Sequence, residues 1–184
     1  MLYLFIKKPV SLFITYNPQN QSERILANRL HTIAAVNGFN AFLPDRFYDG
    51  FIISDATRKY IQIADYFILF SFGPLSEAVK SEIILAYQKT TDACKIFVVY
   101  DRNKGKNLTG DLSNQFTPIY YDTKTPDLAY LQEQIFEAIQ KNQLTNTLSL
   151  PKKVKEENDV ANAIGALLGI GLGLVVLGSV FGKK

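Results

Sequence analysis

The chain has 184 residues, 47% of them apolar, and a formal charge of +3. This length can bury one sizeable core but not two comfortable domains, so we expect one globular domain with appendages. The small charge, with no concentrated basic face, argues against nucleic acid as a partner. A single cysteine, Cys94, excludes an internal disulfide, and the reducing cytoplasm is the expected location of the globular part.

Short apolar runs alternate with segments of helical spacing along residues 11–141. In chain order they predict a strand at 11–16, a helix at 21–37, a strand at 41–43, a helix at 55–64, a strand at 66–71, a helix at 76–89, strands at 95–100 and 118–121, and a helix at 127–141. Two of the runs, 66–71 and 95–100, lack polar alternation, as is typical of parallel strands covered on both faces. The order predicts an α/β fold with a doubly wound, flavodoxin-like parallel sheet of five strands.

Capping residues define the first helix. Asn20 and Glu23 have the spacing of a capping box, and Gly38 is suited to end the helix. Residues 45–54 mix charged, aromatic and glycine residues, which favours a surface loop. Leu26, Leu30, Ile33 and then Val36 or Asn37 follow at helical spacing.

Polar residues follow the predicted strands at their carboxyl ends, where ligands bind in folds of this type. Tyr16 and Asn17 come after the first strand, Asp45 after the second, and Ser71 ends the third. Glu82 lies nearly two turns into the next helix, and helical geometry predicts a position at the rim of the buried face.

Four segments resemble the Toll/interleukin-1 receptor (TIR) domain family, particularly its NAD-cleaving members. FITY at 13–16 resembles the first-strand FISY pattern, and GFNAFLPD at 38–45 resembles the second-strand pattern G-F-x-V-F-x-D. ADYFILFS at 64–71 resembles the family strand that ends in serine. AVKSEI at 78–83 resembles W-V-x-x-E-I, the stretch that carries the catalytic glutamate. The resemblance covers residues 10–141 and follows the family order.

The resemblance implies a NAD+ nucleosidase, which cleaves NAD+ or converts it to a signalling nucleotide, with Glu82 as the catalytic residue. A carboxylate beside the ribose can stabilise the oxocarbenium-like state formed when nicotinamide leaves. Tyr16 would stack on a flat base, Asn17 and Ser71 would offer polar contacts, and Asp45 would close over the substrate. NAD+ is then the substrate, and neither a cofactor nor a metal is expected.

Each of these residues also has a structural interpretation. Glu82 can be an ordinary solvated helix residue, Tyr16 can pack at the edge of the core, and Asp45 can belong to a solvated loop. Asp101, after the fourth strand, is expected in a cap or turn, and His31 is expected to be structural.

One departure from the family pattern concerns Ala78, which stands where the family has tryptophan. It favours an alternative, a non-enzymatic TIR module that signals by self-association. A nucleoside deoxyribosyltransferase-like glycosidase is a further alternative, because that similar sheet also presents a glutamate after a strand.

The C-terminal part differs in composition. Residues 1–10 are predicted as an arm or extra strand, 11–141 as the TIR-like domain, 142–160 as a polar linker, 161–182 as a glycine-rich transmembrane helix and 183–184 as a basic end. The stretch 163–182 has no charge, and at about 1.5 Å per residue a helix of this length spans roughly 30 Å, enough to cross a bilayer.

Glycines on two faces of this predicted helix allow close approach of neighbouring helices. One face has Gly165, Gly169 and Gly173, and the other has Gly171, Gly178 and Gly182. We therefore expect a single-pass, membrane-anchored TIR-domain enzyme with a cytoplasmic domain, acting in a defence or cell-death response. Its expected partners are NAD+ or a related nucleotide, the lipid bilayer, and further copies of the chain that associate through the domain and the tail. In a third alternative the glycine-rich helices themselves assemble and disrupt a membrane.

Overall fold

The computed structural model describes residues 9–46, 53–89, 95–104 and 116–148. Strands and helices alternate in the predicted order. They are β1 (Ser11–Thr15), α1 (Gln21–Val36), β2 (Asn40–Phe42), α2 (Asp55–Ile63), β3 (Tyr66–Ser71), α3 (Glu77–Lys89), β4 (Ile96–Asp101), β5 (Thr117–Tyr121) and α4 (Leu128–Leu148).

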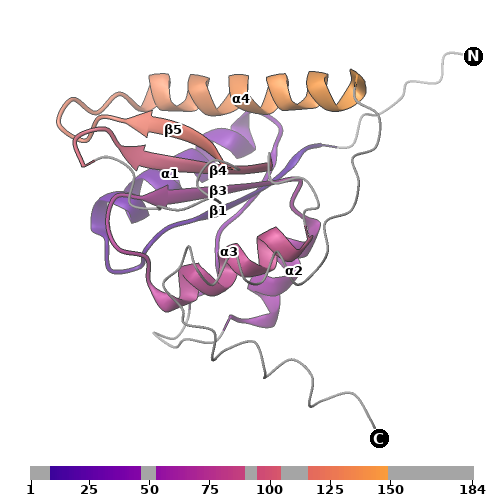
Figure 1. Ribbon diagram of the computed structural model, residues 1–184, viewed down its shortest axis with the longest axis horizontal. Coiled ribbons are helices and arrows are strands. Elements are labelled where there is room, and N and C mark those ends of the chain that lie inside the picture. The colour runs from indigo at the N-terminus through magenta and orange to yellow at the C-terminus, as the bar shows by residue number, and fades with distance from the viewer. Residues whose placement is uncertain (1–8, 47–52, 90–94, 105–115, 149–184) are drawn as a thin grey trace, which may run out of the picture.

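The five strands form one sheet in the order β2-β1-β3-β4-β5, and every neighbouring pair is parallel. This is the flavodoxin-like order, so the predicted fold class of the globular part is confirmed. The arrowheads of β3, β4 and β5 point to the same side of the molecule, the left side of Figure 1. The loops that follow the strands therefore gather at one edge of the sheet.

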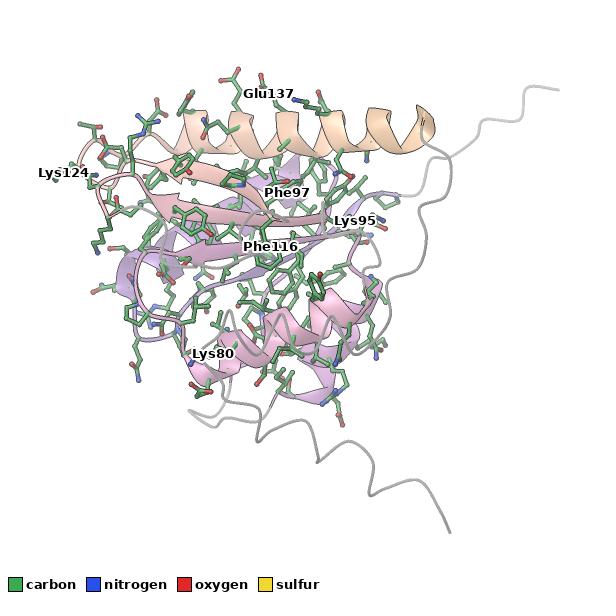
Figure 2. All side chains as sticks on the ribbon, in the orientation of Figure 1. Lys80, Lys95, Phe97, Phe116, Lys124 and Glu137 are labelled. Carbon is green, nitrogen blue, oxygen red and sulfur yellow. The ribbon has the colours of Figure 1, made fainter. Side chains whose placement is uncertain are left out.

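Helices cover both faces of the sheet. Buried residues of α1 and α4 pack on one face, and those of α2 and α3 pack on the other (Figure 1). Alternate residues of each strand supply the two layers: in β4, Phe97 packs with the α4 layer and Val98 with the α3 layer. Figure 2 labels Phe97 in the first layer and Phe116 in the second.

Local signals explain the boundaries of α1. The Asn20 side chain accepts a hydrogen bond from the Glu23 N–H at 3.3 Å, as the capping box predicts. Gly38 follows the helix with φ of +81°, a conformation that favours glycine. Of the apolar residues at helical spacing, Leu26 and Leu30 are buried, whereas Val36 is 83% exposed and Ala34 takes the last buried position of the helix.

Helix α4 is longer than predicted. It continues past Lys141 to Leu148, so residues 142–148, predicted as the start of the polar linker, are helical. No proline or glycine interrupts the sequence between Lys141 and Leu148.

Among the described residues, no helix is both long enough and apolar enough to cross a bilayer. The predicted transmembrane helix at 161–182 and its glycines lie outside the described residues, as do residues 1–8 of the predicted arm.

Candidate functional site

Two strands end in buried hydroxyl residues on the face covered by α3. Thr15 is the last residue of β1 and Ser71 the last of β3, and both side chains are fully buried. On the same face, two residues earlier in each strand, lie the buried apolar residues Phe13 in β1 and Leu69 in β3. The apolar floor beneath α3 therefore becomes polar at the carboxyl edge of the sheet.

Glu82 lies above the end of β1, with only 2% of its surface exposed. The Thr15 hydroxyl donates to Glu82 Oε2 at 2.5 Å, and Arg46 Nη2 donates to the same oxygen at 2.9 Å. The Arg46 group also donates to Thr15 Oγ1 at 2.9 Å. The prediction that Glu82 lies at the rim of the buried face is wrong: the carboxylate is inside, where a hydroxyl and a guanidinium satisfy it.

Arg46 comes from the segment that follows β2 and also covers Tyr16. Its guanidinium carbon lies 5.4 Å from the centre of the Tyr16 ring, an arrangement that favours a cation–π contact. The Arg46 side chain is 14% exposed. We call Thr15, Tyr16, Arg46 and Glu82 the Glu82 site.

Burial controls the charge of Glu82. Desolvation raises the pKa of Glu82 from 4.5 to about 7, although the positive charge of Arg46 and the hydrogen bond from Thr15 oppose this rise. The group therefore changes protonation close to neutral pH. A carboxyl group with this pKa can stabilise positive charge when ionised and can accept a proton from water.

The other predicted binding residues have structural contacts. The Asn17 amide donates to the Pro74 carbonyl at 3.0 Å, and its oxygen accepts from the Gln19 N–H at 3.1 Å. Asp45 is half-buried beside Arg46, and its N–H donates to the Thr57 hydroxyl at 2.8 Å. The structure thus joins Tyr16 to Glu82 through Arg46, whereas the Asn17 amide connects two loops.

A second buried carboxylate, Glu23, fixes the loops around the Glu82 site. It is 1% exposed and accepts hydrogen bonds from the N–H groups of Asn17 and Phe72, each at 2.7 Å, and from the Asn20 amide at 3.0 Å. Burial raises its pKa, against the effect of these bonds. Since Asn17 follows β1 and Phe72 follows β3, Glu23 holds together the exits of these two strands.

Asp101 and His31 have structural roles, as expected. Asp101 accepts from the Asn103 N–H at 3.0 Å and from the Thr123 hydroxyl at 2.9 Å. Burial acts to raise the pKa of Asp101, but its hydrogen bonds outweigh burial and lower it. His31 Nε2 lies 3.1 Å from the Ala41 carbonyl and connects α1 with β2.

A separate hollow of about 550 Å³ lies where β5 meets the beginning of α4. Its lining includes Arg102, Tyr120, Asp122 and Tyr130. Asp122 is already an acceptor for Asn103 and Thr125. Both β3 and β4 separate β5 from β1, so this hollow is distinct from the Glu82 site.

Sequence reasoning identified Glu82 and Tyr16 but missed Thr15 and Arg46. Thr15 was included in an apolar strand, and Arg46 was one charge in a predicted surface loop. The signal for both was position, since each lies at or just after the carboxyl end of a strand. In the part of the chain that the structure describes, no cluster of His, Cys, Asp and Glu is suited to hold a metal ion.

The fold and the site together define a class: a flavodoxin-like α/β domain with a buried, ion-paired glutamate at the carboxyl edge of its sheet. No protein-family model matches the sequence, and a comparison with curated proteins gives no match.

Solved structures of similar fold include a flavodoxin-like domain from Synechococcus sp., with 17% identity and a TM-score of 0.46 over 70% of this chain and 92% of that one. The CMP N-glycosidase of Clostridium botulinum has 18% identity and a TM-score of 0.46, covering 69% of this chain and 98% of its own. The TIR domains of the activated Roq1 resistosome, which recognises the pathogen effector XopQ, have 14% identity and a TM-score of 0.43. The match covers 88% of this chain and 82% of that one. All three identities are low, so the chemistry is inferred from the residues of this chain.

Proposed function

We propose that the chain hydrolyses the N-glycosidic bond between nicotinamide and ribose in NAD+, with Glu82 as the catalytic carboxylate. The observation that carries the proposal is the buried Glu82 carboxylate at the carboxyl edge of the sheet, paired with Arg46, whose guanidinium also lies over the Tyr16 ring. The four TIR-like sequence segments support the same assignment, because AVKSEI places Glu82 at the position of the family glutamate.

The reaction suits a single carboxylate. When the bond between ribose C1′ and the pyridinium nitrogen breaks, its electron pair leaves with neutral nicotinamide, and the ribose ring becomes cationic. Ionised Glu82 stabilises that cation in a site from which water is largely excluded. Water then adds to C1′ and loses a proton, and Glu82, with a pKa of about 7, can accept it. The products are nicotinamide, ADP-ribose and a proton.

Three further residues prepare the site. Thr15 orients the carboxylate through its hydrogen bond, and the Tyr16 ring offers a flat face to the base. Arg46 covers both groups, so substrate entry requires its guanidinium to move.

The test is nicotinamide release from NAD+, followed by liquid chromatography with the full chain. We expect Glu82→Gln to lower the rate at least about a hundredfold, because the amide carries no charge to stabilise the ribosyl cation. Glu77→Gln is the matched control: it changes an exposed glutamate of the same helix, whose only described ion pair is with Lys80. Equal rates for wild type and Glu82→Gln would exclude Glu82 as the catalytic group.

A second candidate is a non-enzymatic signalling module. Ala78 replaces the family tryptophan one turn before Glu82, and Glu82 is almost fully covered. This candidate predicts no nicotinamide release from any of the three proteins, so the same assay decides between the two functions.

Residues 161–182 are proposed to anchor the domain in a membrane and to bring copies together through their two glycine faces. Anchoring raises the effective concentration of neighbouring domains, which suits an enzyme that self-association activates in a defence or cell-death response.

A further inference from the structure

One side chain, Arg46, occupies the contacts that a substrate needs in the Glu82 site. Its Nη2 group bonds to Glu82 and Thr15, and its guanidinium lies against the Tyr16 ring. While Arg46 remains there, it occupies Glu82 Oε2 and Thr15 Oγ1 and covers one face of the Tyr16 ring. A substrate must therefore replace Arg46, and the chemistry of that replacement restricts the substrate.

Displacement of Arg46 leaves two charges without partners. Glu82 would keep a buried carboxylate with no cation beside it, and Arg46 would lose its carboxylate. Breaking a buried pair in this way is strongly unfavourable unless both charges find new partners. A neutral nucleoside supplies neither partner.

Arg46 also has bonding capacity to spare. Its Nε atom is buried and has no hydrogen-bond acceptor among the described residues. The hydrogen bonds of Arg46 within the described residues use Nη2 alone, so the fork of Nε and Nη groups that binds phosphate in a bidentate way is largely unused. A structural arginine would be expected to use this fork.

We infer that Arg46 selects the substrate by exchange of partners: it leaves Glu82 to bind a phosphate on the ribose, while the pyridinium ring replaces it beside Glu82. This inference rests on the proposed hydrolysis of NAD+ and specifies its substrate class, a phosphorylated pyridinium nucleoside. Such a molecule carries both charges on a single ribose, the cation at C1′ and the anion at C5′. Moving Arg46 onto the phosphate also uncovers the Tyr16 face for the base.

Nicotinamide mononucleotide and nicotinamide riboside differ only in this phosphate and therefore test the inference. We expect kcat/KM of the full chain to be at least about tenfold higher for the mononucleotide, because charge-assisted bonds to phosphate are strong. In Arg46→Gln the two values should converge: the mononucleotide loses its phosphate ligand, and the riboside no longer has to displace a cation. A fall for one substrate together with a rise for the other is a result that structural damage does not produce.

Arg58→Gln is the matched control, since Arg58 is an exposed arginine of α2, and it should retain the wild-type preference. Thermal unfolding followed by circular dichroism checks that Arg46→Gln is folded.

The inference is overturned if Arg46→Gln changes kcat/KM for both substrates by the same factor, in either direction. If wild type cleaves neither compound, calorimetric binding of both compounds decides on Arg46, and nicotinamide release from NAD+ separately decides on the proposed hydrolysis. If wild type binds the mononucleotide and the riboside with equal affinity in the calorimeter, Arg46 does not bind the phosphate and the inference is overturned.

Discussion

Glu82 affects the stability of the fold, because its pKa differs between the folded and unfolded chain. Burial raises the folded pKa to about 7 from an ordinary value of 4.5. Between these two pH values the folded state binds more protons than the unfolded state, so the free energy of unfolding decreases as pH rises. The contribution is fully present below pH 4.5 and is lost as pH rises through about 7. The size of this loss is about 3 kcal/mol.

Replacement of Glu82 by glutamine should remove this pH dependence. The amide oxygen can still accept from Thr15 and Arg46 but does not titrate. We expect the free energy of unfolding of Glu82→Gln to increase relative to wild type by about 3 kcal/mol between pH 4.5 and 8. Urea denaturation at several pH values measures this difference, and the raised pKa of Glu23 cancels because both proteins contain it. If the difference in free energy of unfolding between the two proteins stays constant with pH, the pKa of Glu82 is not raised in the folded state.

At the scale of elements, Glu23 connects α1 to the exits of β1 and β3. Its carboxylate accepts hydrogen bonds from two backbone N–H groups, the partly buried one of Asn17 and the buried one of Phe72. The loop that carries Tyr16 therefore depends on a residue of the neighbouring helix. Rigid second contacts of this kind are needed to hold a functional side chain in place.

Glu23→Ala should therefore cost more than the loss of an ordinary helix cap. Each N–H left without an acceptor costs about 1–3 kcal/mol, so we expect the free energy of unfolding to fall by about 3 kcal/mol. Asn20→Ala removes the cap and one side-chain hydrogen bond to Glu23 but leaves the acceptor of both loop N–H groups in place, so it should cost about 1 kcal/mol. Urea denaturation compares the two variants, and equal losses would show that the loop bonds contribute nothing beyond capping.

The elements were predictable where the signal is local. β3 has the predicted limits at both ends, because its continuous apolar run stops at Ser71 before Gly73 and Pro74. The end of α4 was not predictable from periodicity, because no breaker marks it. The burial of Glu82 was also inaccessible, since its partners Thr15 and Arg46 are 67 and 36 positions away in the sequence. Helical spacing predicts on which side of the helix a residue lies, whereas the tertiary structure determines which residues pack against that side.

At the scale of the molecule, the proposed anchor makes location testable. The full chain should sediment with liposomes, whereas a chain that ends at Leu148, the last residue of α4, should stay in the supernatant. Centrifugation with and without liposomes measures this, and sedimentation without liposomes identifies aggregation. A full chain that remains in the supernatant with liposomes contradicts the anchor.

The position of β2 has a consequence for how the Glu82 site opens. β2 has three residues, Asn40–Phe42, lies at the edge of the sheet and pairs with β1 alone. None of its residues is fully buried, so its local unfolding exposes little apolar surface and breaks few backbone hydrogen bonds. Arg46 is attached just beyond this strand, whereas Thr15 and Glu82 belong to elements of the fully packed centre. The side chain that covers Glu82 is thus attached next to a short edge strand of the sheet, whereas Glu82 itself belongs to a helix packed on the centre of the sheet.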